Sequence, residues 1–230
     1  MTRPKGLKRA AILDIDGTLL NSNDAHAHAW REALEEIGVH LSYHRIRNLM
    51  GEGGDQFLEG LTGFVPGSLQ EKVLSARRGE IYRSRYFSAL DLFPLVPELL
   101  AKMRSEGIRM TVASSAPAAD LVAVLRRFRL EEFFESPVSA DDAAASKPSP
   151  DLIELAVNRL GGDRRRIWML GDTPYDIQAA SRAGVSTIAF RSGGWSDFQL
   201  QDAVAVYDGP ADLLARFAES PFQQSGQAAA

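Results

Sequence analysis

The fold is decided by residues 10–18, which read AAILDIDGT. A short apolar run bounded by turn residues is typical of a buried strand in a parallel sheet. Asp14 and Asp16 follow at positions i and i+2 of extended chain, so their side chains point to the same side. We therefore expect two carboxylates to converge just beyond the carboxyl end of the first strand.

Further along the chain, apolar strands alternate with amphipathic helices. The expected strands are Ile108–Ala113, Ile167–Leu170, Val185–Phe190 and Ala203–Val206, and the expected helices include Pro150–Leu160, capped by Ser149, and Asp176–Ala183. This alternation predicts an α/β fold with a doubly wound parallel sheet, Rossmann-like in its core. In such folds, ligands bind at the carboxyl ends of the strands.

The segment between the first two strands has a different, helical pattern. Trp30, Ala33, Leu34 and Ile37 recur at helical spacing, which predicts a helix over Asp24–Ile37, and glycine clusters farther on indicate loops between short helices. We therefore expect a core domain of residues 1–20 and 91–219, a small inserted all-helical cap of residues 21–90, and a disordered tail at residues 220–230.

Composition restricts the classes of partner. The 26 Lys and Arg against 30 Asp and Glu give a net charge of −4, which argues against a nucleic-acid partner. The chain has no cysteine, so a metal would need oxygen or histidine ligands. No apolar run approaches the roughly 18 residues of a membrane span. We expect a cytoplasmic protein, and the oligomeric state stays open.

Polar residues follow the other expected strands as well. Ser114 and Ser115 follow the second strand, Asp172 and Asp176 follow the third, and Lys147 precedes a helix. Each residue alone has an ordinary explanation, such as a helix cap or a solvated lysine. Their joint placement at strand ends instead favours one common site.

The chemistry expected of this site is phosphoryl transfer. Asp14, Asp16 and Asp172 together concentrate negative charge that a hard cation would offset, and oxygen ligands select Mg²⁺. A carboxylate can act as a nucleophile that forms an aspartyl-phosphate. Lys147 and Ser114 suit the neutralisation of the transferring group.

These residues resemble the four motifs of the haloacid dehalogenase superfamily over nearly the whole chain. The resemblance implies Asp14 as nucleophile, and Asp16 as general acid and base with its backbone carbonyl on the metal. It also implies Ser114 on a phosphoryl oxygen and Lys147 bridging Asp14 and the phosphoryl group. Asp172 would ligate Mg²⁺, and Asp176 would hold the outer shell of the metal through water.

The helical segment resembles the cap of the phosphoglycolate phosphatase and β-phosphoglucomutase branch. Relatives that cleave carbon–halogen bonds lack the second aspartate of the first motif, so Asp16 argues against dehalogenation. Asn21 departs from an aspartate often found there, which bears on the cap hinge. The full expected sets are, for metal, Asp14, Asp16, Asp172 and Asp176, and for phosphate, Gly17, Thr18, His26, Ser114, Ser115 and Lys147.

Two features of the cap leave alternatives. His26, His28, His40 and His44 lie in one short window, but positions i and i+2 of a helix face different sides, which favours ordinary packing over a metal cluster. Only His26 resembles a position near the active site in the sugar-phosphate mutases. The loop Gly51–Gly54 is either a flexible turn or a loop that touches the leaving group of the substrate.

We therefore expect a Mg²⁺-dependent phosphatase acting on a small phosphorylated metabolite, of the phosphoglycolate or sugar-phosphate type. The alternative is a β-phosphoglucomutase-like mutase, and a non-catalytic regulatory protein is disfavoured because every motif residue is present. A mutase would need basic cap residues for a distal phosphate. The candidates are Arg31, Arg45, Arg47, Lys72, Arg77, Arg78, Arg83 and Arg85.

Overall fold

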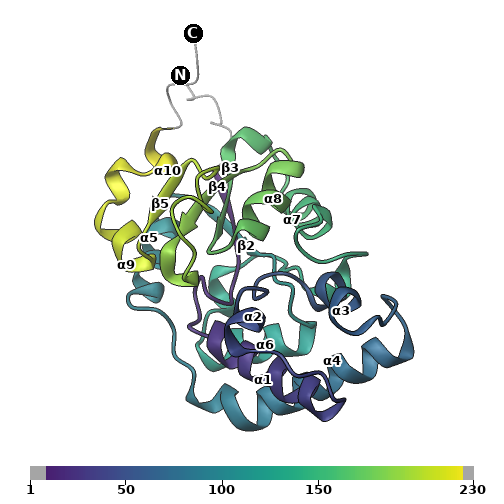
Figure 1. The fold of residues 1–230 in the computed structure, drawn as a ribbon. Coiled ribbons are helices and arrows are strands. Elements are labelled where there is room, and N and C mark those ends of the chain that lie inside the picture. Colours follow the sequence, from purple (N-terminus) through teal and green to yellow (C-terminus); the bar gives the residue numbers. More distant parts are fainter. Residues whose placement is uncertain (1–8, 225–230) are drawn as a thin grey trace, which may run out of the picture.

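A five-stranded parallel sheet forms the centre of the molecule, in the order β2-β1-β3-β4-β5 (Figure 1). The computed structural model describes residues 9–224. The strands are β1 (Ala10–Leu13), β2 (Arg109–Val112), β3 (Ile167–Gly171), β4 (Ser186–Phe190) and β5 (Ala205–Tyr207). The predicted α/β fold with a parallel sheet is confirmed, although the last strand begins two residues later and ends one residue later than expected.

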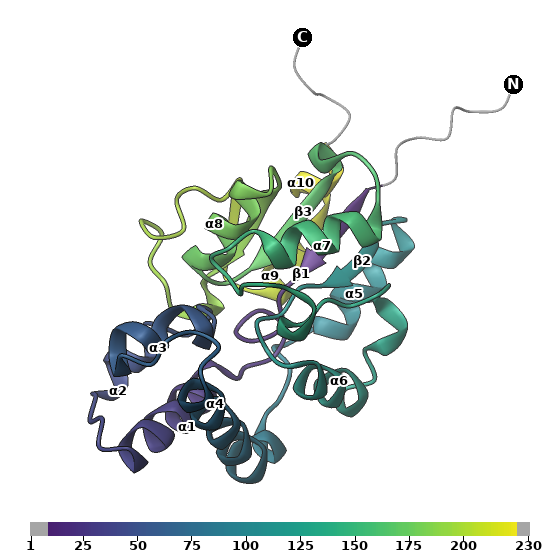
Figure 2. The same cartoon turned by 90° about the vertical axis from the view of Figure 1, so that its right-hand side faces the viewer.

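Helices cover both faces of this sheet (Figures 1 and 2). They are α5 (Val96–Ser105), α6 (Ala118–Arg127), α7 (Asp151–Leu160), α8 (Pro174–Arg182), α9 (Pro210–Ala215) and α10 (Pro221–Gln224). Successive residues of β1 point to opposite faces. Ala10 and Ile12 belong to the apolar cluster under α7 and α8, whereas Ala11 and Leu13 belong to the cluster under α5, α9 and α10.

A helical region lies between β1 and β2 in sequence, beyond the carboxyl ends of the strands in space (Figure 2). It contains α1 (Asn23–Glu36), α2 (Tyr43–Arg47), α3 (Gly54–Thr62), α4 (Leu69–Ile81), the π-helical turn η1 (Tyr82–Tyr86) and the 3-10 turn η2 (Phe87–Ala89). We call residues 23–89 the helical insertion. None of the helices described is long and apolar enough to cross a membrane.

Short 3-10 turns occupy several of the connections. They are η3 (Glu131–Phe133), η4 (Ala140–Asp142), η5 (Arg164–Arg166), η6 (Arg191–Gly193) and η7 (Phe217–Glu219).

Two predicted helix starts need correction. Ser149 does not cap α7, because Pro150 is the N-cap residue and the Ser149 hydroxyl bonds the Asp151 carboxylate instead. Helix α8 begins at Pro174, two residues earlier than predicted. Asp176 is therefore the third residue of that helix, where its carboxylate completes a capping box with Thr173.

The predicted disordered tail is wrong for residues 220–224. Residues 221–224 form α10, and the Phe222 side chain is fully buried, with its ring 5.3 Å from that of Trp168 and 5.8 Å from that of Phe217. The prediction of disorder rested on the polar composition of the segment and overlooked the one aromatic residue, Phe222, that packs into the core. The remainder of the predicted tail, residues 225–230, lies outside the described residues.

This anchor makes a measurable contribution to stability. We expect Phe222→Ala to lower the free energy of unfolding by about 3 kcal/mol, because the substitution removes a fully buried ring and leaves a cavity. Urea denaturation followed by circular dichroism measures the change. A loss below about 0.5 kcal/mol, the size of an exposed substitution, would contradict the packing of α10.

Candidate active site

Three segments bring an ion-pair network together at the carboxyl end of the sheet. Asp14 follows β1, Asp176 lies in the first turn of α8, and Lys147 lies on the irregular segment before α7. The Lys147 Nζ atom is 2.5 Å from Asp14 Oδ1 and 2.8 Å from Asp176 Oδ1. All three side chains are buried, with Lys147 only 1% exposed. Burial of this lysine is tolerable only because it pairs with both carboxylates.

A third carboxylate, that of Asp172 after β3, completes a buried acidic triad. Asp14, Asp172 and Asp176 each offer an oxygen atom, and these atoms lie within 4.8 Å of one another. Three carboxylates face one ammonium group, so up to two negative charges lack a partner. A divalent cation with oxygen ligands would supply the missing charge. The triad could therefore bind a metal.

The electrostatics of the triad agree with this inference. Burial raises the pKa of the Asp14 carboxyl well above its usual range; Lys147 opposes this shift, and Asp176 adds to it. Burial and the nearby Asp176 charge raise the pKa of Asp172 to about 7. The pKa of Lys147 rises despite burial, which by itself lowers it, because Asp14 and Asp176 stabilise the ammonium form.

The carboxylate of Asp172 is held in place by the loop after β1. Thr18 Oγ1 donates to Asp172 Oδ1 at 2.7 Å, and Asn23 Nδ2 donates to Asp172 Oδ2 at 3.0 Å. Gly17 has φ +81°, and a Cβ atom there would lie 2.2 Å from Asp172 Oδ2. Thr18 thus bonds a metal-ligand candidate, and its expected contact with the phosphate stays a prediction. Sequence reasoning missed Asn23, which begins a helix 149 residues away from its partner.

Asp176 is fixed by its own helix. Thr173 Oγ1 donates to Asp176 Oδ2 at 2.7 Å, which leaves Asp176 Oδ1 facing Lys147. The sequence contained this signal, since Thr173 precedes Asp176 by the spacing of a capping box. The water-mediated metal contact expected of Asp176 stays a prediction.

The side chain of Asp16 has hydrogen-bond partners outside the triad. Its Oδ1 atom accepts a hydrogen bond from Ser22 Oγ at 2.5 Å and lies 2.9 Å from His26 Nε2. Burial raises the pKa of Asp16, but the charge and hydrogen bond of His26 outweigh it, together with Ser22, and the net shift is downward. The His26 ring stacks on Tyr82 with 4.1 Å between centroids. Metal coordination by the Asp16 carbonyl stays a prediction.

The two predicted serines differ in what their hydroxyl groups do. Ser114 Oγ accepts a hydrogen bond from the Ala116 amide at 3.1 Å. The buried Ser115 Oγ has no hydrogen-bond partner within residues 9–224. Ser115 also lines the pocket at the site. The role of Ser114 on a phosphoryl oxygen stays a prediction.

A pocket of about 70 Å³ lies between the sheet and the helical insertion. Asp14, Asp16, His26 and Arg78 line it together with the loop Gly51–Gly54. This placement favours the interpretation that the loop borders the substrate over that of a flexible turn. A second pocket of about 230 Å³ shares Trp30, Arg78 and Ser115 with the first and adds Asp55 and Glu71.

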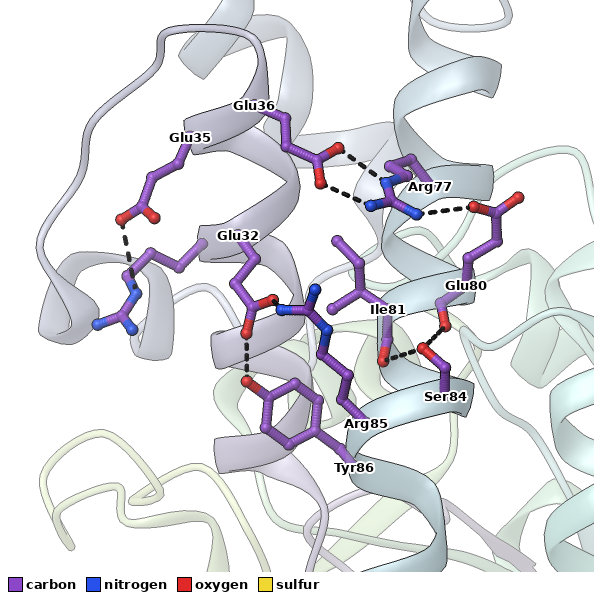
Figure 3. Close-up of polar contacts among 10 residues, drawn as sticks. Glu32, Glu35, Glu36, Arg77, Glu80, Ile81, Ser84, Arg85 and Tyr86 are labelled. Carbon is purple, nitrogen blue, oxygen red and sulfur yellow. Dashed lines mark hydrogen bonds and ion pairs between the residues drawn. The ribbon is translucent and has the colours of Figure 1, made fainter.

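Of the eight candidate basic residues, all of which the structure describes, Arg78 alone lines these pockets. It is 8% exposed, and its guanidinium carbon lies 5.1 Å from the centre of the Trp30 ring. Figure 3 shows Arg77 bound to Glu36 and Glu80, and Arg85 bound to Glu32. Arg31 pairs with Glu35, Arg47 with Asp24 and Arg83 with Asp120, while Arg45 and Lys72 are exposed.

The remaining histidines pack as expected. His28 stacks on Tyr43 with 4.8 Å between ring centroids, and His44 meets the edge of the same ring at 5.6 Å. His40 is exposed. These ring contacts and this exposure agree with the interpretation of the three as ordinary packing and surface residues.

Comparisons with known proteins agree with this geometry. Residues 11–190 match the family model of the haloacid dehalogenase-like hydrolases. The chain is 27% identical to fructose-1-phosphate phosphatase YqaB of Escherichia coli over 180 residues, which cover 78% of this chain and 95% of that protein. It is 26% identical to phosphoglycolate phosphatase of Pectobacterium atrosepticum over 215 residues, which cover 92% of this chain and 90% of that protein.

A solved structure shows the same fold. A hydrolase from Pseudomonas syringae superposes with a TM-score of 0.82 and 29% identity, covering 91% of this chain and 98% of that chain. The chain therefore belongs to the haloacid dehalogenase-like hydrolases. Within them it falls in the phosphoglycolate phosphatase and β-phosphoglucomutase-like subfamily, and its enzyme class is that of the phosphatases of this family.

The raised pKa of Asp172 predicts a pH-dependent metal affinity. Below about pH 7 this carboxyl carries a proton in the metal-free protein, and a metal must displace it. We expect Mg²⁺ affinity to rise as the pH increases from 6 to 8, with release of a proton. Calorimetry in buffers of different ionisation enthalpy measures both. Equal affinity at pH 6 and pH 8 would contradict the assignment of Asp172 as a ligand.

Proposed function

We propose that this protein is a Mg²⁺-dependent phosphatase that hydrolyses a small phosphorylated metabolite, of the phosphoglycolate or sugar-phosphate type, through an aspartyl-phosphate on Asp14. One observation carries the proposal: Asp14 borders the pocket between sheet and insertion while its carboxylate belongs to the buried triad and pairs with Lys147. A nucleophile, a charge-neutralising lysine and a metal site thus meet at one point. A cytoplasmic location, expected from the sequence, is part of this proposal.

In the first step, an oxygen of Asp14 attacks the phosphorus atom, and the bond from phosphorus to the leaving oxygen breaks. Asp16 gives a proton to that oxygen. Asp14, Asp172 and Asp176 would hold Mg²⁺, which supplies positive charge to the phosphoryl group. Lys147 orients Asp14 and offsets charge on the same group.

In the second step, water attacks the phosphorus atom and the bond to Asp14 breaks. Asp16 takes a proton from the attacking water, and Asp14 leaves as a carboxylate when its bond to phosphorus breaks. The lowered pKa of Asp16 keeps it ionised, which is the form that accepts a proton. For the first step, the negative charge of an arriving phosphate favours the protonated form of Asp16.

The lining of the pockets favours a phosphatase over a bisphosphate-dependent mutase. Arg78 is the basic residue of the helical insertion at the pockets; one of its terminal nitrogens lies 3.4 Å from His26 Nδ1, and its Nε atom has no hydrogen-bond partner within residues 9–224. Two acidic residues, Asp55 and Glu71, line the second pocket. A second phosphate placed there would meet like charge, which disfavours its binding.

The proposed reaction depends on the charge of Asp14. We expect Asp14→Asn to lower the rate of Mg²⁺-dependent hydrolysis of phosphate monoesters about a thousandfold or more, because an amide is not a nucleophile. Phosphate release from a panel of phosphometabolites, with and without Mg²⁺, measures this. Asp202→Asn, at an exposed aspartate, is the matched control. Residual activity within about tenfold of the wild type would remove Asp14 from this role.

The charge of the second pocket predicts substrate preference. We expect kcat/KM for fructose 1-phosphate to exceed that for fructose 1,6-bisphosphate by about tenfold or more, which corresponds to about 1.4 kcal/mol of repulsion. Glu71→Gln should narrow this ratio, since it removes one negative charge from the pocket wall. Preference for the bisphosphate, or an unchanged ratio in Glu71→Gln, would contradict this account of the pocket.

A further inference from the structure

The start of α3 binds the backbone of the segment that carries Lys147. The Gly53 amide donates to the Lys147 carbonyl oxygen at 3.0 Å, and the Ser146 amide donates to Asp55 Oδ2 at 3.0 Å. Gly53 is the N-cap residue of α3, and Asp55 lies in its first turn. The helical insertion therefore holds two consecutive residues of the core at two points.

Gly53 is required here for close approach. Its φ is −67°, which any residue adopts, so the backbone conformation does not demand glycine. A Cβ atom at this position would lie 2.1 Å from Ser146 Cβ and 2.4 Å from Asp55 Oδ1. A side chain at residue 53 would thus push the insertion away from the lysine segment.

The segment that carries Lys147 has little regular structure of its own. Residues 143–150 contain no helix or strand. Within the segment, the Ser149 amide donates to the Ser146 carbonyl at 3.0 Å, and from α8 the Arg182 guanidinium donates to the Pro148 carbonyl at 2.7 Å. The contacts from Gly53 and Asp55 are therefore well placed to set the Lys147 backbone.

We propose that Gly53 and Asp55 are positioning residues that set the Lys147 ammonium group onto Asp14 and Asp176. They act through the Ser146–Lys147 backbone. The position of the helical insertion is thereby coupled to the ion pairs that Lys147 makes with the two carboxylates. The kinetic part of this inference rests on the proposed phosphatase function. The structural part, the placement of Lys147, does not.

Asp55→Ala tests the coupling because it removes the acceptor for the Ser146 amide. Asp55→Asn is the rescue variant, since an amide oxygen still accepts that hydrogen bond. Gly53→Ala is a second, independent disruption of the same contact. Gly60→Ala is the control, because Gly60 lies in α3 and a Cβ atom there meets no other atom within 4 Å.

The first readout does not require activity. The ¹³Cε resonance of Lys147, assigned with Lys147→Arg, reports the surroundings of its ammonium group, and amide hydrogen exchange reports the order of residues 143–150. We expect Asp55→Ala and Gly53→Ala to shift the resonance and to speed exchange in that segment. Asp55→Asn and Gly60→Ala should leave both close to wild type. An unshifted resonance in both disrupting variants would overturn the inference.

The second readout is turnover of acetyl phosphate, which has a small leaving group. We expect Asp55→Ala to lower kcat about five- to tenfold, the size of one lost hydrogen bond, with KM nearly unchanged. Loss confined to larger substrates would show that Asp55 contacts substrate instead, and would overturn its positioning role. If the wild type hydrolyses no phosphate ester, the proposed function fails, and the Lys147 resonance still decides the coupling.

Discussion

The structure of the active site depends on the burial of three carboxylates around one lysine. Removing these charged side chains from water costs free energy. The cost is tolerable only when each buried charge has partners. Lys147 pairs with Asp14 and Asp176, while Asp172 takes hydrogen bonds from Thr18 and Asn23. The negative charge left over is what makes the triad suited to a divalent cation.

The parallel sheet and the helical insertion contribute different parts of this site. Because β1 and β3 are adjacent and parallel, Asp14 and Asp172 arrive side by side without a specific side-chain contact between them. The insertion supplies Asn23 to the triad, His26 to Asp16 and Arg78 to the pocket. Residues of the insertion and of the sheet therefore meet at the same site.

Strand ends and short motifs allowed the centre of the site to be predicted from the sequence. Asp14, Lys147, Asp172 and Asp176 all meet as expected, because parallel strands place their carboxyl ends at one edge. The contact of Asn23 with Asp172 was not predicted, since it joins residues distant in sequence with no spacing rule between them. The sequence likewise did not show that Arg78, among the basic residues of the insertion, lines the pocket, because this depends on how the helices pack.

The errors at the element ends have a similar origin. Ser149 and Asp151 interact with each other, so a good capping residue was placed one position too early to cap α7. In the last segment, one buried aromatic ring, Phe222, outweighs polar neighbours that composition alone treats as disordered. Such a single contact depends on residues that are distant in sequence and adjacent only in the folded protein.

The central claim is that Asp14 carries the phosphoryl group during turnover. The most direct measurement mixes the enzyme with Mg²⁺ and acetyl phosphate, quenches within milliseconds, and reduces any acyl phosphate with borohydride before peptide mass spectrometry. The account predicts reduction of the aspartyl-phosphate to homoserine at residue 14, and none in Asp14→Asn. Turnover without homoserine at residue 14 at any quench time would contradict the claim. Homoserine at another position would contradict it as well.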